Sequence, residues 1–180
     1  MILPIIADDE NVAQQVPELP TDLLLSLGDL PDETILRIAG RCGCREILAV
    51  KGNHDGSAPF AAPIRGLHLK TFAFRGVRFG GFCGVWKYKP KGNHLFEQGD
   101  VERLMRGFPP VDVFLAHNSP RLIHDREDDV HTGFVAFNNY ITKAAPKLFL
   151  HGHQHENVET KVGITRVIGT FGHRFLVIPD

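Results

Sequence analysis

Residue types that bind divalent metal ions follow several apolar segments of this sequence. The candidate ligands are Asp8, Glu10, Asp29, Asn53, His117, His153 and His155. Carboxylate and amide oxygens combined with imidazole nitrogens suit Mn, Fe or Zn. Seven ligands are too many for one tetrahedral zinc ion. The set therefore predicts two metal ions that share one carboxylate.

Asn53 is followed directly by His54 and Asp55, so three polar side chains come in a row. An amide oxygen can bind a metal ion, an imidazole can act as an acid, and a carboxylate can orient either of them. Considered alone, the segment fits an ordinary polar turn equally well. We interpret it as part of a site because other predicted strands end in the same kind of residue.

Five apolar runs precede these ligands, and we predict each of them as a β-strand. They cover residues 2–7, 23–27, 47–50, 111–116 and 148–150. A continuous apolar run suits a strand that is covered on both faces. The carboxyl ends of parallel strands meet at one edge of a sheet, where α/β proteins bind their ligands. We therefore expect the residues that follow these strands to converge.

The rest of the chain predicts helices between the strands and a strand-rich end. Helices are expected at residues 31–40, about 99–107 and about 133–145, a β-hairpin at 68–82, and antiparallel strands at 158–162, 165–168 and 175–178. The basic and aromatic segment 86–91 is expected to lack regular structure. This alternation indicates an α/β fold, and 180 residues fit a single domain spanning 1–180.

Composition narrows the class of protein. Apolar residues make up 43% and charged residues 23%, which is typical of a globular chain. The net charge of −1 gives no general attraction to nucleic acids or membranes. Three cysteines are an odd count, so we expect the reducing cytoplasm and no disulfide framework. No apolar run is long enough to span a membrane, and the sequence does not indicate an oligomeric state.

Five short motifs, taken in order, are similar to those of a known family. They are Asp-x-Glu at residues 8–10, Gly-Asp at 28–29, Gly-Asn-His-Asp at 52–55, Ala-His at 116–117 and Gly-His-Gln-His at 152–155. Together they resemble the calcineurin-like metallophosphoesterases over nearly the whole chain, as a small bacterial-type member with one domain. The first motif departs from the family's usual Asp-x-His, because Glu10 replaces the histidine.

The resemblance implies a sandwich of two mixed β-sheets flanked by α-helices. It also implies an enzyme, a hydrolase that acts on ester bonds of phosphate. In such a dinuclear site, a hydroxide held between two metal ions attacks phosphodiesters or phosphomonoesters, nucleotides among them.

The resemblance further assigns a role to each candidate ligand. The first ion would be bound by Asp8 and His155, the second by Asn53, His117 and His153, with Asp29 bridging the two. His54 would face the substrate beside Asn53, and would stabilise the phosphoryl oxygen or protonate the leaving oxygen. Asp55 would orient His54 or cap the turn after the strand.

Glu10 leaves two questions about the metals open. If Glu10 coordinates, its hard oxygen favours Mn or Fe over Zn, which stays a third candidate. If it points away, the site of the first ion is weaker. A second register would use Asp9 and Asn11 in place of Asp8 and Glu10.

Two other functions compete with the phosphoesterase. The chain could be a non-catalytic binding or scaffold module on the same fold, an interpretation that only Glu10 supports. It could also be a small nuclease in which Lys87, Lys89 and Lys91 contact single-stranded nucleic acid. The overall charge does not favour a nucleic-acid partner, so we interpret this segment as a solvated loop. We expect a small phosphorylated substrate as the partner and no membrane.

Overall fold

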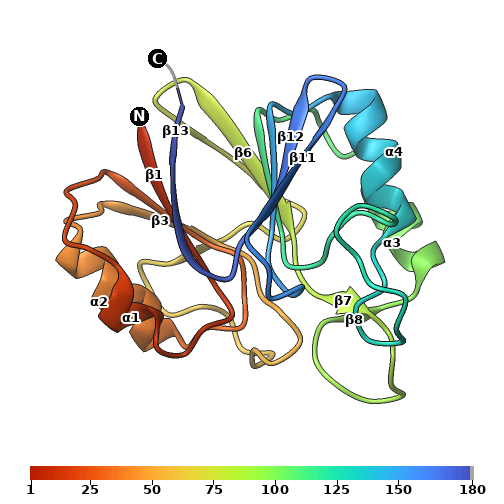
Figure 1. Ribbon diagram of the computed structural model, residues 1–180, viewed down its shortest axis with the longest axis horizontal. Helices are drawn as coiled ribbons and strands as arrows, with labels where there is room; N and C mark the ends of the chain where they lie inside the picture. Colours follow the sequence, from red (N-terminus) through yellow and green to blue (C-terminus); the bar gives the residue numbers. More distant parts are fainter. Residues whose placement is uncertain (179–180) are drawn as a thin grey trace.

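Two large β-sheets pack face to face, and helices cover both outer faces (Figure 1). The computed structural model describes residues 1–178. In spatial order, the first sheet contains β13 (Gly172–Val177), β1 (Ile2–Ala7), β2 (Leu23–Ser26), β3 (Glu46–Ala49) and β4 (Arg65–Gly66). The second sheet contains β11 (Val158–Val162), β12 (Thr165–Gly169), β10 (Leu148–His151), β9 (Val113–Ala116), β6 (Val77–Phe82) and β5 (Thr71–Phe74).

Parallel strands form the centre of each sheet, and antiparallel strands lie at three of the edges. β1, β2, β3 and β4 run parallel in the first sheet, and β13 is antiparallel to β1. In the second sheet β6, β9, β10 and β12 run parallel, with β5 and β11 antiparallel at the edges. Both sheets are therefore mixed, and the expected α/β sandwich is confirmed.

The apolar runs form central strands because both of their faces are covered. In β2, Leu23 and Leu25 point into the core between the sheets, whereas Leu24 packs on the helical side. β9 divides in the same way, with Leu115 in the central core and Phe114 on the outer side. Since side chains alternate along a strand, such a segment has no position that faces solvent.

The helices supply the outer cover of each sheet. α1 (Val12–Gln15) and α2 (Asp32–Arg41) lie on the first sheet, and α3 (Gln98–Met105) and α4 (Val135–Ala144) lie on the second (Figure 1). α2 begins after Pro31 and has two acidic residues in its first turn, where the positive end of the helix dipole stabilises their negative charges. No helix among residues 1–178 is long and apolar enough to cross a membrane.

The structure corrects three expectations. The five ligand-bearing strands do not share one sheet, because β1, β2 and β3 lie in one sheet and β9 and β10 in the other. The segment after Gly84 is not entirely irregular, since β7 (Val85–Trp86) pairs with β8 (Leu95–Phe96). The last strand leaves the hairpin of β11 and β12 and pairs with β1 in the first sheet.

Candidate metal centre

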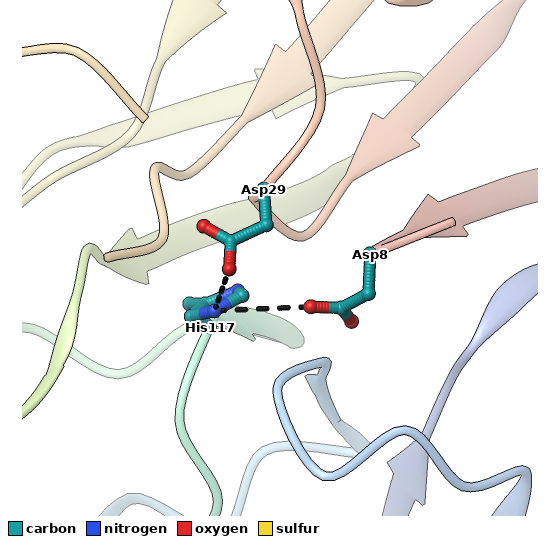
Figure 2. A group of neighbouring side chains, drawn as sticks. All are labelled: Asp8, Asp29 and His117. Atoms are coloured by element: carbon teal, nitrogen blue, oxygen red, sulfur yellow. Dashed lines mark ion pairs between the residues drawn. The ribbon is translucent and has the colours of Figure 1, made fainter. Parts of the chain in front are cut away.

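Asp8, Asp29 and His117 bring their ligand atoms within 4.8 Å of one another (Figure 2). Asp8 follows β1, Asp29 lies after β2, and His117 follows β9, so both sheets contribute. His117 Nε2 lies 3.3 Å from Asp29 Oδ2 and 3.9 Å from Asp8 Oδ1. Figure 2 shows both carboxylates pointing toward the imidazole. The carboxyl ends of the two sheets therefore meet at one cluster.

Left-handed backbone turns aim the two carboxylates into the cluster. Asp8 has φ 63° and Asp29 has φ 55°, a conformation that aspartate tolerates better than most residues. Each carboxylate is also held by a backbone donor. The His153 N–H donates to Asp8 Oδ2 at 3.0 Å, and the His54 N–H donates to Asp29 Oδ1 at 2.9 Å. One oxygen of each group is thus fixed, and the other faces His117.

His117 is fully buried and presents one nitrogen to the cluster. Its Nδ1 lies 2.7 Å from the carbonyl oxygen of Leu27, which can only accept a hydrogen bond. Nδ1 therefore carries a proton, and Nε2 is the nitrogen that can offer a lone pair to a metal ion once it is deprotonated.

Three buried polar atoms at the site have no hydrogen-bond partner among the described residues. They are Asp8 Oδ1, His117 Nε2 and Asn53 Oδ1. Leaving a buried polar atom unpaired costs about 1–3 kcal/mol, so such atoms are rare in folded proteins. All three atoms are of the kinds that bind divalent cations, so the residues fit a metal centre.

The ionisation of the cluster in the metal-free protein agrees with this interpretation. Burial raises the pKa of Asp8 to about 7. Burial also opposes a charge on His117, but the neighbouring carboxylates of Asp29 and Asp8 raise the pKa of His117 to about 9. Burial likewise opposes the charge on Asp29, yet His117 and the His54 N–H lower the pKa of Asp29 to about 2. A proton on His117 thus compensates the carboxylates, and a bound metal ion would displace it.

The predicted ligands after β10 lie beside the same cluster. His155 Nε2 is 3.8 Å from Asp8 Oδ1, and the ring centroid of His153 is 5.1 Å from that of His117. Burial lowers the pKa of His153 to about 3, so its imidazole is neutral. His153 Nε2 lies 3.2 Å from the carbonyl oxygen of Val130, so Nε2 carries the proton and the lone pair is on Nδ1.

The loop after β3 closes the other side of the cluster. Asn53 is buried, and its Nδ2 donates to the Tyr88 hydroxyl at 3.3 Å. His54 is exposed, although its backbone is bonded to Asp29. Asp55 Oδ2 accepts hydrogen bonds from the N–H groups of Asp29 and Gly52, both at 2.8 Å. This carboxylate therefore ties the loop after β2 to the loop after β3.

Comparison with known proteins identifies the family. A family model described as "Calcineurin-like phosphoesterase" matches residues 5–157. The chain belongs to the calcineurin-like phosphoesterase family. This membership supports a metal-dependent phosphoesterase, and the clustered ligands fit the divalent metals that the family typically binds.

Three individual proteins resemble the chain over most of its length. An uncharacterised protein of Haemophilus influenzae is 26% identical over 97% of this chain and 86% of its own. The crystal structure of TT1561 of Thermus thermophilus has a TM-score of 0.61 at 13% identity, covering 94% of this chain and 88% of that one. The phosphopantetheinyl hydrolase PptH of Mycobacterium tuberculosis has a TM-score of 0.60 at 14% identity, covering 99% and 96%. At these identities the two structures share the fold.

In the first motif it is Asp8, and not Asp9, that lies in the cluster. Asp9 accepts hydrogen bonds from Asn11 N at 2.8 Å and from Gln15 Nε2 at 2.7 Å, so both of its oxygens are used in the turn before α1. Glu10 is exposed in the same turn and is not a member of the three-residue group found among residues 1–178.

Two contacts of the candidate site could not be foreseen from the ligand pattern. Tyr88 reaches Asn53 from the segment that we expected to be a solvated loop. His131 stacks near His153, with ring centroids 5.0 Å apart, and its Nδ1 is 2.8 Å from Asp128 Oδ2. His151, the last residue of β10, is buried, and its Nε2 lies 2.9 Å from His124 Nδ1.

Proposed function

We propose that this chain is a dinuclear metal-dependent phosphoesterase that hydrolyses phosphodiesters or phosphomonoesters, small nucleotides among them. The observation that carries the proposal is the set of buried, unpartnered ligand atoms of Asp8, Asn53 and His117 among the described residues. Unpaired buried polar atoms also occur elsewhere in residues 1–178, but these three belong to residues that follow β1, β3 and β9, and His117 Nε2 faces the carboxylate oxygens of Asp29 and Asp8, at 3.3 and 3.9 Å. Their lack of partners is expected if cations complete the site.

The proposed ligand sets are those that the family resemblance implies, and the cluster of Asp8, Asp29 and His117 is compatible with them. Asp8 and His155, whose atoms are 3.8 Å apart, would hold the first ion, and Glu10 stays a candidate for it. Asn53, His117 and His153 would hold the second ion, and Asp29 would bridge the two. This mixture of oxygen and nitrogen donors suits Mn or Fe, with Zn as a third candidate.

Two residues that are not proposed as metal ligands have separate roles: His54 faces the substrate, and Asp55 positions the loops of the site. A pair of bound divalent ions supplies Lewis acidity toward the phosphoryl group and lowers the pKa of water. His54 is exposed at the open side of the cluster, where its imidazole can hold a phosphoryl oxygen or give a proton to the leaving oxygen. Asp55 acts through the two backbone N–H groups that it holds, so we assign it a positioning role.

The test is hydrolysis of an aryl phosphodiester and an aryl phosphomonoester by Mn-loaded protein. We expect His54→Ala to lower kcat by roughly 10²- to 10⁴-fold with metal content unchanged, because it removes an acid that is not a ligand. Asp29→Asn should lower both metal content and activity. His173→Ala, in β13 and packed against Phe175, is the matched control and should retain activity. Full activity in both His54→Ala and Asp29→Asn protein would refute the proposed mechanism.

A non-catalytic module on the same fold is the second candidate, and the exposed side chain of Glu10 favours it. This candidate predicts no hydrolysis of either ester after Mn loading. The nuclease alternative is weakened because Lys87 is paired with Glu97 at 3.3 Å, which offsets one of the three lysine charges. The three free cysteines agree with a reducing cytoplasmic location.

A further inference from the structure

The Tyr88 hydroxyl contacts the buried amide of Asn53. Asn53 Nδ2 lies 3.3 Å from the Tyr88 hydroxyl, and Asn53 Oδ1 has no hydrogen-bond partner among residues 1–178. Tyr88 lies on the segment between β7 and β8, 35 residues away in the sequence. The hydroxyl therefore reaches the metal centre from outside the motifs that carry the ligands.

The chemistry of an amide explains what this contact does. Only the amide oxygen can bind a cation, whereas the amide NH₂ group can only donate hydrogen bonds. The two orientations of the amide differ by a flip of about 180°, and an unsupported Asn53 could present either end to the cluster. In the orientation found here, the Tyr88 hydroxyl oxygen accepts a hydrogen bond from the NH₂ group, and this leaves Oδ1 free to bind a cation.

The segment that carries Tyr88 is fixed to the loop of Asn53 at several points. The Gly84 N–H donates to the Lys51 carbonyl at 2.7 Å. Further along, Asn93 Nδ2 donates to the Asp55 carbonyl at 3.0 Å, and His94 Nε2 lies 3.1 Å from the Gly56 carbonyl. The pairing of β7 with β8 closes the base of the segment. Tyr88 is thus held in a defined position relative to Asn53.

We propose that Tyr88 is a positioning residue of the metal centre, which holds the Asn53 amide with its oxygen toward the second ion. This inference rests on the proposed function, because it assumes that Asn53 binds a metal ion. Loss of a partner that orients a metal ligand typically lowers metal affinity or activity by roughly 10- to 100-fold. If Tyr88 acts only by orienting Asn53, removing its hydroxyl should have little effect when residue 53 is a ligand that needs no orientation.

The experiment is a calorimetric Mn²⁺ titration of metal-stripped full-length protein. Four proteins are compared: wild type, Tyr88→Phe, Asn53→Asp and the double variant. A carboxylate presents an oxygen to the metal ion in either orientation, so the side chain of Asn53→Asp does not have to be held in one of them. We expect Tyr88→Phe to weaken the second Mn²⁺ by roughly 10- to 100-fold beside Asn53. Beside Asp at position 53, the same change should cost less than about threefold.

Tyr140→Phe is the matched control, because it also removes a tyrosine hydroxyl, here on a buried side chain of α4 that accepts from Val111 N–H and donates to the Pro109 carbonyl. It should leave Mn²⁺ affinity unchanged. The inference is overturned if Tyr88→Phe binds both ions as wild type does. It is also overturned if the loss is equal beside Asn and Asp, since Tyr88 would then act as a general structural residue. Absence of Mn²⁺ binding in wild type would instead overturn the proposed function and this inference with it.

Discussion

Replacing Gly52 by alanine tests directly whether the loop after β3 forms part of a metal centre. A Cβ atom at position 52 would lie 2.1 Å from Asp29 Oδ1 and 2.5 Å from His117 Nε2. Real Cβ atoms essentially never approach another heavy atom closer than 3.0 Å, so the added methyl group must displace something. The nearest atoms belong to a short aspartate and a fully buried histidine, neither of which has a flexible end that can move aside.

Overpacking of this kind costs about 1–3 kcal/mol. If the strain is relieved by displacing Asp29 and His117, it appears as roughly 5- to 150-fold weaker Mn²⁺ binding. If the side chains stay in place, the same strain lowers the free energy of unfolding. The loss of Mn²⁺ binding free energy and the loss of unfolding free energy are complementary. We expect the two together to amount to about 1–3 kcal/mol.

Gly56→Ala is the matched control, because it lies on the same loop and an added Cβ meets nothing within 4 Å. Both variants would be compared by Mn²⁺ titration, by urea unfolding without metal and by hydrolysis of an aryl phosphodiester. If Gly52→Ala matches Gly56→Ala to within about 0.5 kcal/mol in affinity and stability, the close approach that we describe does not exist.

The buried groups lead to three further expectations. Without metal, the folded state binds protons more tightly than the unfolded state, because the pKa of Asp8 is raised to about 7 and that of His117 to about 9. The stability that these bound protons contribute is present at low pH and is lost as the pH rises through both pKa values. The rise in Tm caused by Mn²⁺ should therefore be larger at about pH 8 than at about pH 6. Equal rises at the two pH values would contradict this expectation. Asp55→Ala should destabilise the protein by about 1–3 kcal/mol in urea unfolding, since two backbone N–H groups lose their shared acceptor, and Asp55→Asn should cost less. Phe114→Ala should cost about 3–5 kcal/mol, because this ring is fully buried and stacked on Phe149 at 5.1 Å, and a loss below about 1 kcal/mol would argue against that packing.

The ligand-bearing strands could be predicted because their sequences have a sharp boundary. β2 is apolar at every position up to Ser26, since one face meets the other sheet and the other face meets the helices. Where that double cover stops, polar residues begin at once, as Asp29 does after Gly28. The same boundary after β1, β9 and β10 marks Asp8, His117 and His153. The order of the motifs along the chain then indicated the family.

The pairing of strands could not be predicted in this way. An apolar run shows that a strand is buried but not which strand lies beside it, so the division into two sheets came only from the resemblance. Strands of two residues, such as β4 (Arg65–Gly66), are too short to show any alternation. The contact of Tyr88 with Asn53 depends on a loop path that no local pattern encodes.

The direction of the Glu10 side chain could not be predicted from the sequence for a different reason. Two residues apart on a strand, Asp8 and Glu10 would point to the same side. The strand ends at Ala7, however, and Asp8 adopts a left-handed conformation that turns the chain into the segment before α1. The alternation no longer applies beyond that turn, so the sequence alone could not place the Glu10 side chain.

The pairing of β1 with β13 has a consequence for how the protein is made. β1, the strand before Asp8, is synthesised long before β13 (Gly172–Val177), yet the two strands lie side by side (Figure 1). Their antiparallel pairing sets Ile2 opposite Val177. Contacts between such distant segments form slowly, because the entropy of closing a long loop is lost before the contacts contribute any stabilising free energy. During translation β1 therefore remains an open sheet edge until nearly all of these residues have left the ribosome. We expect nascent chains that lack β13 to depend on chaperones and to bind metal ions poorly.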